Sequence, residues 1–243
     1  MLLARSGEEF VVAADSAMRN ADGTLSTVQK IFPVGKNGAL LLAGMVSLQD
    51  PVSKPVREEI NISRIAASWL GSHPEADIRS AREQINSQVL AALTQFFSVR
   101  NPGAEANQYK FTLIYAGFLD DKPVWNATRY YLPGKKGTSP RAEDLRLEAG
   151  SGDVRIFSGS EAVRELLQGK SHRLSEFKKA VQKLQNAGTQ SLQAEDYLQL
   201  FSTTLDAAES EEGSKLDGGR AVIAVPNRFA IITRKEGFAW RTP

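Results

Sequence analysis

The strand-forming segments of this chain come in pairs joined by tight turns, and this pattern constrains the fold more than any other feature. Hairpins of this kind build antiparallel sheets, whereas parallel strands need a long crossover between them. The chain is therefore predicted to form antiparallel sheets. The pairs are Leu2–Ala4 with Phe10–Ala14, Lys30–Val34 with Ala39–Ala43, and Phe111–Ala116 with Val124–Thr128.

Helical patterns separate these strands. From Ala76 to Phe97 the apolar residues recur at spacings of three and four, which is typical of an amphipathic helix. The order of strands, helices, strands, helices and strands predicts an α+β fold, with two antiparallel sheets and helices on their outer faces, in a single domain over 1–243. The other predicted helices are Ile62–Leu70, Glu161–Leu167 and an interrupted stretch over Leu174–Ala208, and the other predicted strands are Val154–Phe157, Arg220–Val225 and Phe229–Thr233.

Composition excludes several classes of function. The 243 residues contain no cysteine and only two histidines, so we expect no disulfide, no metal site and no cofactor. The net charge of +2, without a basic stripe, predicts no nucleic-acid partner. The longest apolar run, Ala39–Val46, is too short to cross a bilayer, so we expect no membrane partner and a cytoplasmic location.

Six segments of the chain resemble, in their order and spacing, the β-type subunits of the proteasome. These subunits belong to the N-terminal-nucleophile (Ntn) hydrolases and share a four-layer αββα fold. The resemblance covers nearly the whole chain, and it implies a homo-oligomeric ring that cleaves peptides or unfolded proteins. The segments are Val11–Ser16, Val28–Gly35, Leu42–Gly44, Tyr115–Val124, Phe157–Ser160 and Asp217–Val225.

The resemblance also implies a set of site residues. In this family the hydroxyl of an N-terminal threonine attacks the peptide carbonyl, and the α-amine of the same residue takes the proton. By motif, Asp15 and Lys30 are the acidic and basic residues close to the nucleophile, and Gly44 supplies the oxyanion N–H. Ser158 is the serine that helps to position the amine, and Asp217 is a further carboxylate near the site.

Each of these residues also has an ordinary structural interpretation. Asp15 ends an apolar strand and is suited to a turn, and Lys30 is suited to an exposed strand edge. Gly44 can simply end a strand, and Ser158 can cap a helix. Asp217 precedes two glycines, where a turn-forming aspartate is common.

The chain departs from the family pattern in two places. Counting back from Asp15 to the position of the catalytic threonine passes Met1, and removal of Met1 would expose Leu2, which has no nucleophile. We therefore expect the domain to be truncated at its first strand. In addition, the family usually carries an aspartate and then a serine before the paired glycines, whereas this chain has Ser214 and then Asp217.

Three interpretations stay open. The natural protein begins upstream with a threonine and is a threonine-type peptidase, or the chain is a catalytically silent assembly subunit with the same fold. The third is a small-molecule amidohydrolase, because one scaffold can host several chemistries. Retention of both Asp15 and Lys30 favours the first interpretation, and the N-terminal mass of the natively expressed protein distinguishes it from the second.

Overall fold

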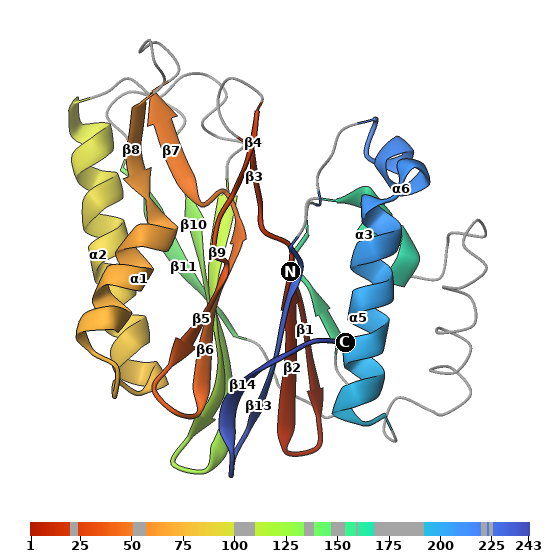
Figure 1. Cartoon of the computed structure of the whole chain (residues 1–243). Helices are drawn as coiled ribbons and strands as arrows, with labels where there is room; N and C mark the ends of the chain where they lie inside the picture. The colour runs from red at the N-terminus through yellow and green to blue at the C-terminus, as the bar shows by residue number, and fades with distance from the viewer. Residues whose placement is uncertain are drawn as a thin grey trace. The chain divides into compact units, whose positions relative to one another are not determined.

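Two antiparallel five-stranded sheets organise the chain (Figure 1). The structure is a computed structural model, and it divides the chain into a first unit, Met1–Ala17 with Ala149–Pro243, and a second unit, Met18–Glu148. Each unit contains one of the sheets, with helices packed against one of its faces. The residues described are 1–19, 24–50, 57–99, 110–133, 139–146, 154–158, 160–167, 192–219, 223 and 226–243.

The sheet of the first unit has the strand order β12-β1-β2-β13-β14. Its central strands are almost completely buried, because apolar side chains point to both faces. Leu2 and Val11 face a cluster that includes Tyr197 and Phe201 of the longest helix in this unit. The elements are β1 Leu2–Ser6, β2 Glu9–Ala14, β12 Val154–Ile156, β13 Arg228–Thr233, β14 Gly237–Arg241, α3 Glu161–Leu167, α5 Ala194–Glu209 and α6 Glu211–Leu216.

The sheet of the second unit has the strand order β11-β10-β9-β6-β5, and α1 and α2 lie along it (Figure 1). The apolar stripe of α2, including Ile85 and Val89, packs with Leu113 and Tyr115 of the sheet. Two short two-stranded sheets, β3-β4 and β7-β8, accompany it. The elements are β3 Ala17–Arg19, β4 Leu25–Thr27, β5 Ile31–Val34, β6 Gly38–Gly44, β7 Ser47–Asp50, β8 Arg57–Asn61, α1 Ile62–Ser72, α2 Ile78–Val99, β9 Lys110–Leu119, β10 Lys122–Tyr131 and β11 Arg141–Arg146.

The antiparallel hairpins and the main helices predicted from the sequence are confirmed. The turn of the β9–β10 hairpin is tighter than predicted, because Asp120 and Asp121 both adopt positive φ and form a two-residue loop. Pro123 therefore lies in β10, opposite Phe118, and not in the turn. The predicted strand Arg220–Val225 and the first part of the predicted Leu174–Ala208 helix lie outside the described residues.

A pair of glycines allows α2 to begin directly over the second sheet. Gly38 of β6 pairs with Gly117 of β9. A Cβ atom at Gly38 would lie 2.6 Å from Cγ1 of Ile78, the first residue of α2, and a Cβ atom at Gly117 would lie 2.2 Å from the Asn37 carbonyl oxygen. Gly117 also has a φ of 149°, which L side chains rarely adopt. Glycine is therefore required where the helix and the two strands meet.

Candidate active site

The register of β1 brings the start of the chain and two predicted site residues to one end of the first sheet. Leu2 lies opposite Ala13 on one side and opposite Ile156 on the other. The Phe157 N–H donates to the Met1 carbonyl oxygen at 3.0 Å, so the pairing continues through Met1. If the same register continued by one step, a residue directly before Met1 would lie between Asp15 and Ser158.

Asp15 is a buried carboxylate in a turn. Asp15 is only 5% exposed, and its Oδ2 accepts a hydrogen bond from the Ala17 N–H at 3.0 Å. The neighbouring Ser16 hydroxyl donates to the Pro226 carbonyl oxygen at 2.6 Å. The contact with Ala17 is the one that a turn-forming aspartate makes, and it fixes the carboxylate at this end of the sheet.

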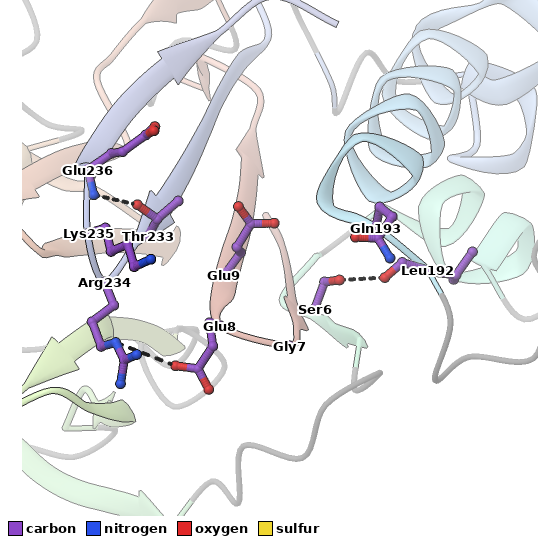
Figure 2. Close-up of a pocket in the computed structure, with 10 residues that line it drawn as sticks. All are labelled: Ser6, Gly7, Glu8, Glu9, Leu192, Gln193, Thr233, Arg234, Lys235 and Glu236. Atoms are coloured by element: carbon purple, nitrogen blue, oxygen red, sulfur yellow. Dashed lines mark hydrogen bonds and ion pairs between the residues drawn. The ribbon is translucent and has the colours of Figure 1, made fainter.

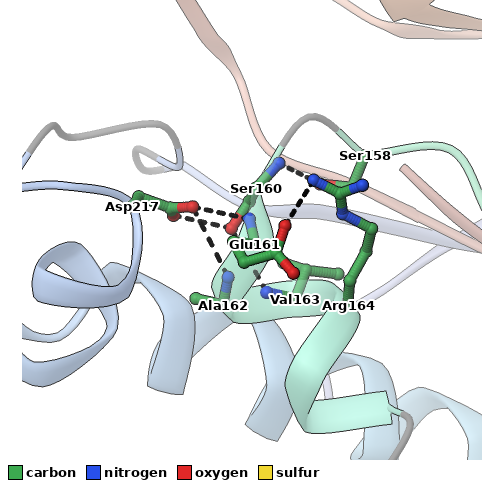
Figure 3. Close-up of polar contacts among 7 residues, drawn as sticks. All are labelled: Ser158, Ser160, Glu161, Ala162, Val163, Arg164 and Asp217. Atoms are coloured by element: carbon green, nitrogen blue, oxygen red, sulfur yellow. Dashed lines mark hydrogen bonds and ion pairs between the residues drawn. The ribbon is translucent and has the colours of Figure 1, made fainter.

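Ser158 and Asp217 belong to a second cluster at the N-terminus of α3 (Figure 3). The Ser158 hydroxyl oxygen accepts from the Ser160 N–H at 3.0 Å, and the Ser160 hydroxyl donates to Oδ2 of Asp217 at 2.7 Å. The structure therefore connects Ser158 with Asp217 through Ser160. The sequence predicts Ser160 as the N-cap of the Glu161–Leu167 helix, and its hydroxyl oxygen accepts from the Val163 N–H. The contact with Asp217, 57 positions away, has no local signal in the sequence.

Lys30 and Gly44 lie at one end of the second sheet. The Leu42 N–H donates to the Lys30 carbonyl oxygen at 2.8 Å, which extends the β5–β6 pairing by one step beyond Ile31. Gly44, two residues further along, ends β6 and has a φ of 92°. Lys30 is half-buried and Gly44 is exposed, and both lie where the β5–β6 pair ends.

The predicted site residues thus fall into two sets, one in each unit. Asp15, Ser158 and Asp217 belong to the first unit, and Lys30 and Gly44 to the second. Within each unit, the members of a set lie at one end of the sheet. The exception is Asp217, which is linked to Ser158 through its hydrogen bond with Ser160. The predicted proximity of Asp15 and Lys30 stays a prediction.

A separate hollow lies at the opposite end of the first sheet, where the β1–β2 and β13–β14 turns meet the start of α5 (Figure 2). It has a volume of about 520 Å³. Burial, together with the charges of Glu195 and Glu236, raises the pKa of Glu9 in its wall, while Arg241 acts in the opposite direction. Glu8 forms an ion pair with Arg234 at 3.9 Å. None of the five predicted site residues lines this hollow.

Comparison with known proteins identifies the fold. No protein-family model and no curated protein matches the sequence. Anbu (ancestral beta-subunit) from Yersinia bercovieri matches with a TM-score of 0.55 at 10% identity, over 99% of this chain and 86% of that chain. The Anbu complex from Pseudomonas aeruginosa, solved as a helical assembly, matches with a TM-score of 0.57 at 12% identity, over 99% and 86%. Anbu from Hyphomicrobium sp. strain MC1 matches with a TM-score of 0.51 at 12% identity, over 99% and 84%.

The chain has the fold of Anbu. The predicted α+β fold with antiparallel sheets is therefore confirmed, with Anbu (ancestral beta-subunit) proteins as fold neighbours, and the four-layer stacking of its sheets stays a prediction. At identities of 10–12% the likeness carries the fold alone, and no catalytic activity follows from it.

Over the residues that the structure describes, no three His, Asp or Glu side chains are grouped so that they could hold a metal ion. None of the helices in the described ranges combines the length and the hydropathy that crossing a membrane requires.

Proposed function

We propose that this chain is a proteasome-β-like subunit that hydrolyses peptide bonds when a threonine is joined directly before Met1. The observation that supports this proposal is the register of β1. Continued by one step, that register would put a residue before Met1 between Asp15, which follows β2, and Ser158, which follows β12. An amine and a hydroxyl at that position would have a buried carboxylate on one side and a serine hydroxyl on the other.

The proposed reaction needs no group from outside the chain except water. The threonine hydroxyl oxygen bonds to the peptide carbonyl carbon while the α-amine takes its proton, since the free pKa of such an amine is about 7.7–8.0. The resulting ammonium returns the proton to the leaving nitrogen as the C–N bond breaks, which leaves an ester. Water then attacks this ester, with the amine again as base, and releases the acid and the free threonine.

The proposal gives the remaining residues electrostatic roles. The Gly44 N–H would donate to the oxyanion, and the Lys30 ammonium would favour deprotonation of the threonine hydroxyl. These roles require the two sheets to stack with Lys30 and Gly44 beside Asp15, as in a four-layer αββα domain over 1–243. The proposal therefore includes that arrangement.

Two extended forms of the full chain test this function. In the first, a threonine immediately precedes Met1, and in the second, one glycine separates the threonine from Met1. Because neighbouring residues of a strand point to opposite faces, we expect a threonine-directed electrophile to label the first form and not the second. Intact mass spectrometry measures the adduct. The matched control has alanine in place of the added threonine.

The outcomes separate the parts of the proposal. Labelling of the first form that is lost on Asp15→Asn or Lys30→Met substitution supports the assigned roles. Labelling of the second form alone would contradict the register argument. Absence of labelling in both forms would contradict the enzyme, and cleavage of small amides without cleavage of peptides would favour the amidohydrolase.

The second candidate is a catalytically silent subunit that serves in assembly. The fold shared with the Pseudomonas aeruginosa Anbu complex, which was solved as a helical assembly, supports assembly in both candidates and does not favour this one over the first. Both candidates include a homo-oligomer, and we expect a ring. Light scattering coupled to size-exclusion chromatography should give a multiple of 26.5 kDa, and a monomer at all concentrations would contradict the oligomer.

A further inference from the structure

Asp217 ends one helix, and its carboxylate caps another (Figure 3). Asp217 follows the last residue of α6. Its Oδ1 accepts from the Glu161 N–H at 2.6 Å and from the Ala162 N–H at 3.4 Å, both in the first turn of α3. Asp217 lies in the turn after α6, as the sequence predicts for an aspartate before two glycines, and its described side-chain bonds go across to Ser160 and the first turn of α3.

Every polar group of Ser160 forms a hydrogen bond. It is 0% exposed, and its hydroxyl donates to Oδ2 of Asp217 at 2.7 Å. The same hydroxyl oxygen accepts from the Val163 N–H at 3.2 Å. Its backbone N–H donates to the Ser158 hydroxyl oxygen, and its carbonyl accepts from the Arg164 N–H at 3.4 Å. A residue fixed in this way holds its backbone N–H in one direction.

We infer that Ser160 and Asp217 are positioning residues for the Ser158 hydroxyl. This inference rests on the proposed function, in which Ser158 lies beside the N-terminal amine. A serine hydroxyl turns freely between staggered rotamers unless a partner selects one. Here the Ser160 N–H occupies an acceptor site on the Ser158 oxygen, so the hydroxyl proton is directed away from α3.

The physical reason for a distant carboxylate is the shortness of α3. A seven-residue helix has few internal hydrogen bonds, and its first N–H groups need external acceptors. The Ser160 hydroxyl oxygen accepts from the Val163 N–H, and the Asp217 carboxylate accepts from the Glu161 and Ala162 N–H groups. A negative charge at this helix end is also favourable. Together these contacts hold Ser160, whose N–H donates to the Ser158 hydroxyl oxygen.

The chain can aim Asp217 at α3 because two glycines follow it. Gly218 and Gly219 have φ angles of 72° and 74°, which reverse the backbone directly after α6. Their N–H groups donate to the Lys215 and Ser214 carbonyl oxygens at 3.2 Å and 2.8 Å. The end of α6 is thereby closed by backbone contacts, and the Asp217 side chain is available for the other helix.

Amide hydrogen exchange of the full chain tests the positioning without any need for activity. We expect Ser160→Ala and Asp217→Asn each to speed exchange of the amide of residue 160 by about tenfold, and the double variant to add little, because both act on one unit. The matched control is Asp77→Asn, since Oδ1 of Asp77 accepts from the Ser80 N–H at the start of α2. It should speed exchange at α2 and not at residue 160.

An unchanged amide of residue 160 in Asp217→Asn, with faster exchange only inside α3, would overturn the inference. Asp217 would then be a helix cap and nothing more. The exchange result stands whether or not the threonine-extended chain is labelled. It therefore separates failure of this inference from failure of the proposed function.

The pH profile of labelling tests the consequence for the site. A hydroxyl that donates to the neutral amine favours the neutral form. In the threonine-extended chain, Ser158→Ala should therefore move the midpoint of the pH–rate profile to higher pH. Ser160→Ala and Asp217→Asn should move it in the same direction, without adding to Ser158→Ala, and Asp77→Asn should leave it in place. A profile that Ser158→Ala shifts but Asp217→Asn leaves unchanged would overturn the inference.

Discussion

In the part of the chain that the structure describes, the longest helices of the two units, α5 and α2, are attached to their sheets by different kinds of contact. In the first unit, α5 presents mainly apolar side chains to the sheet, including the fully buried Phe201 and Leu205. The hydroxyl of its buried Thr204 donates to the Leu200 carbonyl oxygen of the same helix. The attachment of α5 therefore rests on burial of apolar area.

In the second unit, α2 adds a directional polar chain to its apolar stripe. The Tyr115 hydroxyl donates to Oδ1 of Asn86 at 3.0 Å, and Nδ2 of Asn86 donates to the Thr128 hydroxyl oxygen at 2.8 Å. The Thr128 hydroxyl donates to Oδ1 of Asp144 at 2.8 Å, and Arg82 forms an ion pair with the same carboxylate. Burial raises the pKa of Tyr115 well above its usual value, so this phenol stays a donor.

The difference separates stability from specificity. Apolar contacts are non-directional and tolerate small shifts of α5 along the sheet. The polar chain at Asn86 is satisfied in one register of α2 only, because Asn86 accepts from Tyr115 of β9 and donates to Thr128 of β10, and Arg82 pairs with Asp144 of β11. We therefore expect substitutions in α5 to change the free energy of unfolding most, and those in the polar chain to show the stronger coupling.

The largest effect is expected from Phe201→Ala in α5. Truncation of a fully buried phenylalanine removes apolar contacts and leaves a cavity, which costs about 3–5 kcal/mol of unfolding free energy. Urea denaturation followed by circular dichroism measures it, with the exposed Gln199→Ala as control. A loss below about 1 kcal/mol would show that apolar burial does not dominate here.

Asn86→Leu in α2 should have the next largest effect. It leaves the buried Tyr115 hydroxyl without its acceptor, and such an orphaned group costs about 1–3 kcal/mol. Adding Tyr115→Phe should recover part of the loss, because both partners are then apolar. If the second substitution makes the protein less stable still, the polar chain is not the reason for the first loss.

Double-mutant cycles sharpen the contrast. Tyr115→Phe and Thr128→Val act on the same amide group of Asn86, so we expect a coupling energy of about 0.5–1 kcal/mol or more. Leu198→Ala and Leu205→Ala lie two turns apart on α5 and should add within about 0.5 kcal/mol. Equal coupling in both pairs would remove the distinction between the two helices.

The smallest expected effect is on the stability of the protein at acidic pH. Burial acts to raise the pKa of Asp144, but hydrogen bonds from Arg82 and Thr128, with the Arg82 charge, leave that pKa below its usual value. A carboxyl with a lowered folded-state pKa stabilises the protein above its unfolded-state pKa of about 3.9, and this contribution is lost as the pH falls through the folded-state value. Asp144→Asn should reduce the slope of the unfolding free energy against pH in this range. An unchanged slope would contradict the assignment.

The sequence predicted the features that have a local period. The hairpins, the apolar stripe of α2 and the span of α3 all follow from spacing within one segment. The strand β11, Arg141–Arg146, was missed because its exposed charged residues show no apolar alternation. The short helix α6, with two glutamates, a glycine and a lysine, was missed for a related reason.

The candidate site was predicted from the family resemblance and not from periodicity. Asp15 and Ser158 were assigned by motif, and each follows a strand that the sequence also predicts. The link from Asp217 to Ser160 joins residues 57 positions apart, and its cause is the unsatisfied first turn of a short helix. Contacts of this kind depend on how distant elements pack, which no local pattern records.

The position of Met1 within the first sheet has a practical consequence. Met1 is only 4% exposed, and its carbonyl is bonded to the residue that follows β12, whereas Arg241, Thr242 and Pro243 are exposed. An affinity tag fused ahead of Met1 would have to leave the sheet between two paired neighbours. A tag after Pro243 avoids that crowding and is the better handle for purification.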